Sequence, residues 1–238
     1  MIRVEPASGT VRKDQRLWIS IDWSHVPAGE TEGAVTITGP DARPVSVKLK
    51  ALNPSEPTRS SLHGFVETNG CVSIEAEHYT RKVDAGDIRW EKIDDLGRTN
   101  SSMALFPVTA PSRTPPENSP VLEYEMYLFH LGKIEVETIM APTINFVPGR
   151  GLRFALSFDD QPPQIIDALA HPSTADWSQA VEDSVRKVRS THEISGAGYH
   201  TLKLWMVDPG VVVQKLVVNT GGVKPSYLGP PESYHASP

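Results

Sequence analysis

The stretch CVSIEAEHY, residues 71–79, alternates apolar and polar side chains with the period of a β-strand. The apolar side chains fall on one face of this strand, at Val72, Ile74 and Ala76. The polar side chains fall on the other face, at Ser73, Glu75 and Glu77. Two glutamates on one face, with His78 beside the second, allow three interpretations: a catalytic carboxylate pair, a metal site, or the polar face of an ordinary strand.

Segments of the same kind recur along the rest of the chain. They are VLEYEMYLF (121–129), KIEVETIM (133–140), LRFALSFDD (152–160), YHTLKLWMV (199–207) and VVVQKLVV (211–218). Short strands separated by proline and glycine turns are typical of all-β folds. We therefore expect an antiparallel β-sandwich, of the kind called a jelly roll, and not a doubly wound parallel sheet.

Residues 1–57 form a separate β-rich segment. Its alternating runs are LWISIDW (17–23), GAVTITG (33–39) and VSVKLKAL (45–52). They suggest about four strands, which are too few to close a sandwich with both faces covered. We expect this segment to belong to a truncated sandwich or to pack on the rest of the chain.

A run rich in proline and serine, LNPSEPTRSS (52–61), predicts a linker, so the main domain is expected over residues 58–233. The final stretch, KPSYLGPPESYHASP (224–238), has too many prolines for regular structure. We expect it to run extended along the surface and to finish in a tail at 234–238.

One helix interrupts the predicted strands. Ser173 followed by Asp176 fits a capping box, so the helix is expected to start there. Its apolar stripe follows at helical spacing: Trp177, Val181, Val185 and Val188. The cationic cluster RKVR (186–189) then falls in the last turns, where positive charge suits the helix dipole.

The composition excludes several classes of function. A formal net charge of −6 offers no basic face for nucleic acid or for an anionic membrane. No apolar run is long enough for a signal peptide or a membrane span. The single cysteine, Cys71, forms no internal disulfide and is expected to be a buried structural thiol. The motifs of esterases, phosphate-loop proteins, dinucleotide enzymes and zinc proteases do not occur.

The pair Glu75 and Glu77 is a poor candidate for catalysis. Two residues apart on one strand, their Cα atoms lie about 7 Å from each other, within the range of about 5–9.5 Å known for glycosidase carboxylates. Such carboxylates flank the sugar from opposite sides, however, whereas neighbours on one strand face approach it from the same side. Carboxylates also supply the hard oxygen ligands that calcium prefers. If the stretch is instead the polar face of an ordinary strand, Ser73, Glu75 and Glu77 face outward or bond to the backbone of a loop.

Three longer stretches give the chain a family resemblance. They are GFVETNGCVSIEAEHYTRK (64–82), DLGRTNSSMALFPVTAP (95–111) and HTLKLWMVDPGVVVQKLVVNTGGVKPSYLGPPES (200–233). Over residues 64–233 the chain resembles the C-terminal domain of glycoside hydrolase family 115, the xylan α-1,2-glucuronidases. That domain is similar to carbohydrate-binding modules of families 6 and 35.

The resemblance implies an accessory role. In that family catalysis is assigned to a barrel N-terminal to this region, and a barrel of about 250 residues does not fit beside these strands. We therefore expect no catalytic residue and no enzyme activity of the chain alone, as for a fragment of an α-glucuronidase. The expected function is glucuronoxylan binding. The alternative is a structural or dimerisation domain, whose partners are other domains of the parent enzyme or a second copy. Such enzymes are secreted or periplasmic.

The resemblance also implies a metal. Modules similar to families 6 and 35 open with a Glu-x-Glu strand, where many hold a structural calcium that an Asp or Asn of the last strand completes. In this sequence Gln214 takes that position, and its neutral carbonyl oxygen would weaken the site. A calcium site, if present, is expected at Glu75, Glu77 and Gln214.

Sugar recognition needs a flat aromatic ring for the pyranose face, hydrogen-bonding groups for the hydroxyls and a cation for a uronate. The candidate platforms are Trp90 and Trp177. Arg98 and Asn100 lie in a loop after Trp90, and Arg98 could pair bidentately with glucuronate. In the alternative interpretation, Trp90 anchors the core and Arg98 pairs with a neighbouring aspartate, Asp94 or Asp95.

Overall fold

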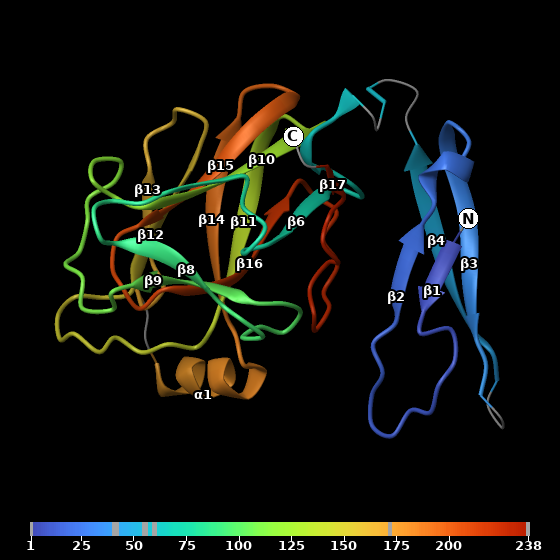
Figure 1. Cartoon of the computed structure of the whole chain (residues 1–238), viewed down its shortest axis with the longest axis horizontal. Helices are drawn as coiled ribbons and strands as arrows, with labels where there is room; N and C mark the ends of the chain where they lie inside the picture. The colour runs from blue at the N-terminus through green and yellow to red at the C-terminus, as the bar shows by residue number, and fades with distance from the viewer. Residues whose placement is uncertain (1, 40–42, 54–56, 59–60, 171–172, 237–238) are drawn as a thin grey trace. The chain divides into compact units, whose positions relative to one another are not determined.

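The computed structural model describes residues 2–39, 43–53, 57–58, 61–170 and 173–236 of the 238-residue chain, without the side chains of residues 174 and 175. The chain divides into two units, Met1–Leu62 and His63–Pro238 (Figure 1). This boundary lies a few residues beyond the one expected from the sequence. Half of the expected linker, residues 54–56 and 59–60, lies outside the described residues.

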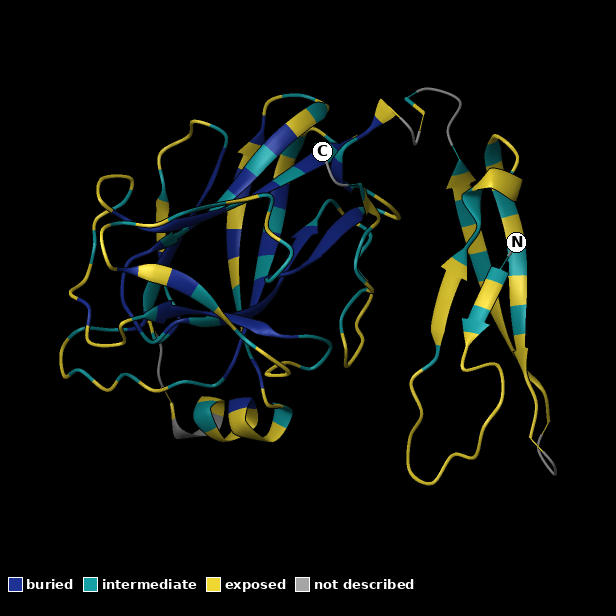
Figure 2. Ribbon diagram, in the orientation of Figure 1, coloured by how far each residue is buried: buried dark blue, intermediate teal, exposed yellow. Residues whose placement is uncertain are grey.

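The first unit consists of two antiparallel ribbons. β1 (Ile2–Glu5) pairs with β2 (Trp18–Ile21), and β3 (Gly29–Ile37) pairs with β4 (Val45–Asn53). A short 3-10 turn, η1 (Trp23–His25), follows β2. No described residue from 2 to 53 is buried, so the ribbons are teal and yellow in Figure 2. Two ribbons of this size bury no core of their own, as the small number of strands predicts.

The second unit is a β-sandwich of two sheets. The first sheet has seven strands in the order β13-β12-β15-β10-β5-β17, with β7 also paired to β10. Its described pairings are antiparallel except that of β5 with β10. Its strands are β5 (Gly64–Val66), β7 (Arg81–Val83), β10 (Val121–Leu128), β12 (Arg153–Phe158), β13 (Gln164–Asp167), β15 (Gly198–Met206) and β17 (His235–Ala236).

The second sheet has six strands and is antiparallel in its described pairings. Its order is β14-β11-β16-β9-β8, with β6 also paired to β16. Its strands are β6 (Cys71–Glu75), β8 (Arg89–Ile93), β9 (Ser102–Phe106), β11 (Gly132–Met140), β14 (Arg186–Ile194) and β16 (Val212–Asn219).

The core lies between the two sheets, because each strand turns alternate side chains inward. The first sheet contributes, among others, Leu122, Tyr124, Met126, Phe154, Leu202 and Leu204. The second sheet contributes, among others, Val72, Ile74, Met103, Val136, Leu216 and Val218. Dark blue strands mark this core in Figure 2. The expected antiparallel sandwich is therefore confirmed, and Cys71 is buried at its edge as expected, where burial raises the pKa of the thiol.

The helix is shorter than the sequence pattern predicted. α1 (Thr174–Asp183) starts as expected, with the Ser173 hydroxyl accepting from the amide of Asp176 at 3.0 Å. It ends at a left-handed C-cap, Ser184, whose φ is 57°. No described helix is long and apolar enough to cross a membrane.

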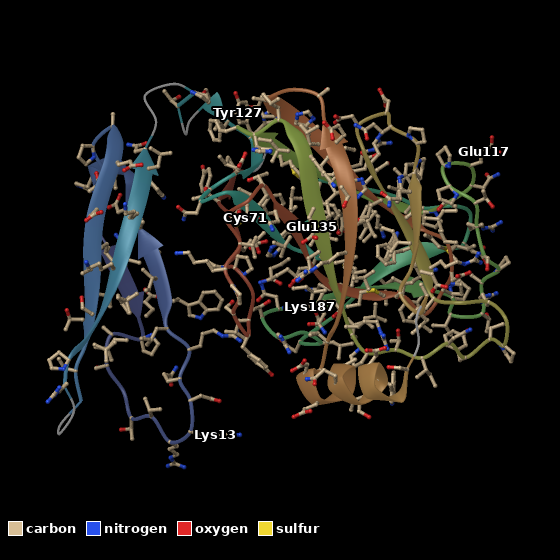
Figure 3. All side chains as sticks on the ribbon, turned by 180° about the vertical axis from the view of Figure 1, so that it is seen from behind. Lys13, Cys71, Glu117, Tyr127, Glu135 and Lys187 are labelled. Atoms are coloured by element: carbon tan, nitrogen blue, oxygen red, sulfur yellow. The ribbon has the colours of Figure 1, made fainter. Side chains whose placement is uncertain are left out.

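The cationic cluster that was predicted for the last helical turns lies instead in β14. Lys187 and Arg189 reach across to Glu137 of β11, with N–O distances of 3.5 and 2.9 Å; Figure 3 labels Lys187 and, on β11, Glu135. The prediction that the helix continues to Val188 was wrong. Val185 and Val188 fit a helical period, but RKVRSTHEI also alternates, and pairing with β11 satisfies its backbone groups.

The end of the chain is part of the sandwich. We call residues 230–236 the strap. Its residues His235 and Ala236 form β17 against β5, and the amide of Val66 donates to the carbonyl of Tyr234 at 2.9 Å. The strap is extended as expected, but its last described residues are a sheet edge and not the predicted tail. Residues 237 and 238 lie outside the described part of the chain.

Candidate functional site

The polar face of β6 lies beneath the strap. Ser73 is fully buried and Glu75 is 3 % exposed. The amide of Ser233 donates to the carbonyl of Ser73 at 2.8 Å, and the amide of Ser73 donates to the Ser233 hydroxyl at 3.0 Å. Glu232 accepts from the amide of Glu75 at 3.1 Å. The polar face of β6 is therefore covered by residues almost 160 positions away in the chain.

Glu75 is paired with a lysine. Lys215 of β16 is its direct Cα partner, and Nζ of Lys215 lies 3.0 Å from Oε1 of Glu75. The two side chains are 3 % and 4 % exposed. The same ammonium donates to the carbonyl of Pro230 at 3.1 Å, and the hydroxyl of Thr99 donates to Oε1 of Glu75 at 2.6 Å. Oε2 of Glu75 is buried without a hydrogen-bond partner among the described residues.

Glu77 lies just beyond the strand and is also engaged. Its Oε1 accepts from the amide of Ser101 at 3.0 Å, and its Oε2 lies 3.4 Å from Nζ of Lys92. Burial acts to raise the pKa of Glu77, but the Ser101 amide and the Lys92 ammonium outweigh it, so the pKa is lowered. The carboxylate is therefore held in its charged form.

Gln214 lies where the register of β16 against β11 shifts, because Met140 partners Val213 while Ile139 partners Lys215. Such a bulge leaves one residue without a cross-strand partner. Gln214 accepts from the amide of Arg98 at 3.1 Å and donates to the carbonyl of Ser184 at 3.3 Å.

The structure thus brings all three predicted metal residues to one loop, 98–101. Gln214 binds it at Arg98, Glu75 at Thr99 and Glu77 at Ser101. Of the three interpretations of the Glu-x-Glu stretch, this geometry matches the strand face that bonds to a neighbouring loop.

Trp90 is not a sugar platform. It is fully buried on β8 within the core, so it presents no ring face to a ligand. Its place in the strand gives the reason: Trp90 and Ile88 are buried on one side while Arg89 and Glu91 pair on the other. The alternative of a core anchor is correct.

The guanidinium of Arg98 is bound by protein groups. Its guanidinium lies 4.0 Å from the ring centroid of Tyr227, and its Nε donates to the carbonyl of Asp183 at 2.9 Å. The side chain is 10 % exposed. Because Asp183 is the last residue of α1, Arg98 satisfies a helix-end carbonyl. Its partner is thus neither of the two aspartates named as alternatives, and glucuronate recognition by Arg98 is not supported.

Asn100 and Trp177 are half-buried. Asn100 belongs to the loop that Glu75 and Glu77 hold, and Trp177 lies on α1. Arg98 links this loop to the end of the same helix. The role of these two residues as ligand contacts stays a prediction.

An aromatic surface that the sequence analysis did not single out lies on the outer face of the first sheet. Tyr127 and Tyr199 are Cα partners on β10 and β15, with ring centroids 5.1 Å apart. The Phe129 ring lies 5.1 Å from Tyr127, and the His63 ring lies 4.2 Å from Tyr199. Tyr199 and Phe129 are 45 % and 42 % exposed. We call these four residues the aromatic surface; Figure 3 labels Tyr127.

Trp205 lies on the same outward row of β15 as Tyr199. It is half-buried, and its indole nitrogen donates to the hydroxyl of Ser157 at 2.9 Å. The two rings are six residues apart, roughly 20 Å at about 3.4 Å per residue. Strand phase could have revealed this row, because a core at Leu202, Leu204 and Met206 turns the intervening residues outward.

A family model described as the Glycosyl hydrolase family 115 C-terminal domain matches residues 64–232. The chain belongs to this family. The match covers nearly all of the second unit. The resemblance noted in the sequence is thereby confirmed.

Several solved structures are similar to this chain. A family GH115 4-O-methyl-α-glucuronidase with specificity for decorated arabinogalactans is 17 % identical, with a TM-score of 0.44 over 59 % of this chain and 17 % of that chain. A family 35 carbohydrate binding module from Clostridium thermocellum is 13 % identical, with a TM-score of 0.42 over 62 % of this chain and 97 % of that one. No curated protein matches.

A third similar structure is the carbohydrate binding module of Cellvibrio mixtus lichenase 5A in complex with cellotriose. It is 15 % identical and has a TM-score of 0.39, and the match covers 62 % of this chain and 95 % of that one. The chain spans less than a fifth of the length of the family 115 enzyme above.

Calcium does not fit the residues of the family 115 domain to which the sequence assigned it. Calcium takes about six to eight oxygen ligands. Each of the three side chains has protein partners, and an ammonium already lies against each carboxylate. Within the described residues, no group of three or more His, Cys, Asp or Glu side chains could hold a metal ion.

Proposed function

We propose that this family 115 C-terminal domain is a non-catalytic accessory module that binds polysaccharide and positions an α-glucuronidase on glucuronoxylan. The observation that carries the proposal is the exposed aromatic surface on the outer face of the first sheet. The family membership supplies the enzyme context, and the aromatic surface supplies a place for sugar rings.

Aromatic rings bind sugars because the apolar face of a pyranose packs on a flat ring. Tyr199 is a large exposed side chain on a rigid sheet, Phe129 is exposed just after the end of β10, and the cross-strand contact of Tyr127 holds Tyr199 in place. Trp205 lies further along the same row of β15. A row of rings along one strand suits a linear chain of sugars.

Polar groups lie between these rings. Thr201 and Lys203 point outward from β15, opposite Glu125 and Glu123 of β10. Nζ of Lys203 lies 3.7 Å from a carboxylate oxygen of Asp160. Hydroxyl and carboxylate groups can bind sugar hydroxyls, while Lys203 is a cation in the same row for a uronate branch. The mixed charge of this face favours recognition of the backbone sugars over the uronate.

A catalytic role for Glu75 and Glu77 is disfavoured by their environment. A glycosidase acid needs a raised pKa, whereas the pKa of Glu77 is lowered. Glu75 is covered by the strap and paired with Lys215. We propose that the chain alone releases no glucuronic acid from glucuronoxylan.

Affinity electrophoresis of the full chain tests the proposal. Native gels that contain glucuronoxylan should retard the wild-type chain, and Tyr199→Ala and Trp205→Ala should restore its mobility. Trp18→Ala serves as the control, because Trp18 is an exposed aromatic of the other unit. Loss of retardation in Trp177→Ala instead would move the site to α1. Gels with decorated arabinogalactan separate the two polysaccharide classes.

The second candidate function is a structural or dimerisation domain. It is favoured by the first unit, where Trp18, Val45 and Leu52 are 58 %, 58 % and 54 % exposed. Apolar side chains at this exposure suit a contact with another protein surface. Sedimentation velocity of the chain over a range of concentrations tests self-association, and a monomer that binds no polysaccharide would leave other domains of the enzyme as partners.

Export from the cytoplasm follows from the proposed ligand. Polymeric glucuronoxylan lies outside the cell, so a module that binds it acts in the secreted or periplasmic space. Fractionation of cells that express the whole enzyme tests this localisation.

A further inference from the structure

A cation is already part of the fold at the place where the resemblance implied calcium. Nζ of Lys215 lies 3.0 Å from Oε1 of Glu75 and 3.1 Å from the carbonyl oxygen of Pro230. We infer that the ammonium of Lys215 is the permanent cation of this carboxylate cluster, and that the domain keeps its fold without a divalent metal.

The ammonium joins segments that are far apart in the sequence. Lys215 lies on β16, Glu75 on β6 and Pro230 at the start of the strap. Through Glu75 the same cluster reaches Thr99 in the loop before β9. Cross-linking of separate segments is what a structural metal does in a small domain. Here one side chain has this role.

The bulge in β16 separates the roles of two adjacent residues. Gln214 has no Cα partner on β11 and binds the loop at Arg98, whereas Lys215 is the Cα partner of both Ile139 and Glu75. The residue that faces Glu75 is therefore the cationic one. The neutral oxygen that the resemblance offered to calcium is already bound to a backbone amide.

Charge balance argues against a second cation. Lys215 neutralises Glu75 in a place where both side chains are at most 4 % exposed. A divalent ion beside this pair would add two buried positive charges without new carboxylates, which is costly. Glu77 already has Lys92 at 3.4 Å. One carboxylate oxygen, Oε2 of Glu75, remains without a hydrogen-bond partner among the described residues, far short of what calcium requires.

Metal titration of the full wild-type chain tests the inference directly. The Tm measured with excess CaCl2 should match the Tm with EDTA to within about 1 °C, because a ligand stabilises a protein only if it binds the native state. Calorimetric titration with CaCl2 should give no saturable heat. A Tm several degrees higher in calcium, or saturable binding, would overturn the inference.

Variants of the pair test the role of the ammonium. Lys215→Met keeps the length of the side chain but leaves Glu75 buried and unpaired, so the Tm should fall far more than in Lys92→Met, whose ammonium is about half exposed. The double variant Glu75→Gln/Lys215→Met should recover most of the lost Tm. Equal losses in Lys215→Met and Lys92→Met would contradict the inference. If Lys215→Met does not fold, folding of the double variant still supports the pair, and failure of the double variant to recover contradicts it.

Discussion

Tyr127 and Tyr199 face each other across β10 and β15, and their rings meet edge to face at an interplanar angle of 87°. The contact fixes the orientation of two large rings on the outside of a rigid sheet. Aromatic pairs in this geometry contribute about 0.5–1.5 kcal/mol beyond the area that they bury. The aromatic surface is therefore preorganised for a flat ligand, and this preorganisation reduces the entropy lost on binding.

Trp90→Ala should lower the free energy of unfolding by about 3–5 kcal/mol, because it removes a fully buried indole from the core. Urea denaturation measures the change. Trp177→Ala is the matched control: Trp177 is half-buried on a surface helix, and its replacement should cost clearly less. If Trp90→Ala folds, its polysaccharide affinity should equal that of the wild type. A loss of polysaccharide affinity in a folded Trp90→Ala variant would show that Trp90 contributes to ligand binding.

Arg98→Lys should lower the Tm without changing the discrimination between xylan with and xylan without glucuronate branches. Lysine keeps the charge but cannot stack a planar guanidinium on Tyr227 while it bonds to the carbonyl of Asp183. The measurement is the ratio of affinities for xylan with and without glucuronate branches. An unchanged ratio is expected, whereas a selective loss for the branched polymer would show that Arg98 binds the uronate.

The strand alternation in the sequence is sufficient to predict the sandwich. A two-residue period places Leu122, Tyr124 and Met126 on the core-facing side of the strand and the residues between them on the other side. Local signals also predict the Ser173 cap, where the contacts lie within a few residues. The end of α1 could not be predicted this way. The run after Ser184 satisfies a helical and a strand period equally well, and only pairing with β11 decides between them.

The candidate site was less predictable, because its contacts are distant in sequence. The burial of Glu75 depends on the strap and on Lys215. No local pattern shows that Pro230 and Glu232 cover β6, or that a bulge sets the register beside Gln214. Trp90 was a candidate sugar platform because Arg98 and Asn100 follow it in a loop, whereas the core-anchor alternative, which the buried Ile88 on the same side of the strand supports, is the one that the structure shows.

Asp208→Asn should destabilise the domain by about 2–4 kcal/mol, because it removes the charge from a buried, multiply bonded carboxylate. Asp208 is fully buried and accepts from Nε of Arg153 at 2.7 Å and from the Ser112 hydroxyl at 2.5 Å. Asp160→Asn is the control, since Asp160 is fully exposed. Chemical denaturation compares the two. Equal free energies of unfolding for the two variants would show that the charge of Asp208 does not stabilise the domain through Arg153.

His192 should make the stability fall as the pH is lowered through 6.5. Burial lowers the pKa of His192 below the ordinary value of 6.5 for a histidine, and its Nε2 lies 2.8 Å from the Ser190 hydroxyl. Below pH 6.5 the unfolded chain therefore binds a proton that the folded chain does not, so the free energy of unfolding decreases; above this pH the effect vanishes.

Thermal denaturation at several pH values checks this expectation with a matched pair of variants. His192→Gln should flatten the dependence of Tm on pH between about 5 and 7. His25→Gln, at a side chain that is 69 % exposed, is the histidine replacement for comparison. A wild-type slope that persists in His192→Gln would assign the pH dependence to other groups.

The most direct test of the central claim is calorimetric titration of the full chain with aldouronic acid oligosaccharides. We predict saturable binding by the wild type, with a weakening of at least about tenfold in Tyr199→Ala, which corresponds to about 1.4 kcal/mol. The affinity should be the same with calcium and with chelator. No detectable binding of these oligosaccharides by a folded wild-type chain would contradict the carbohydrate-binding function.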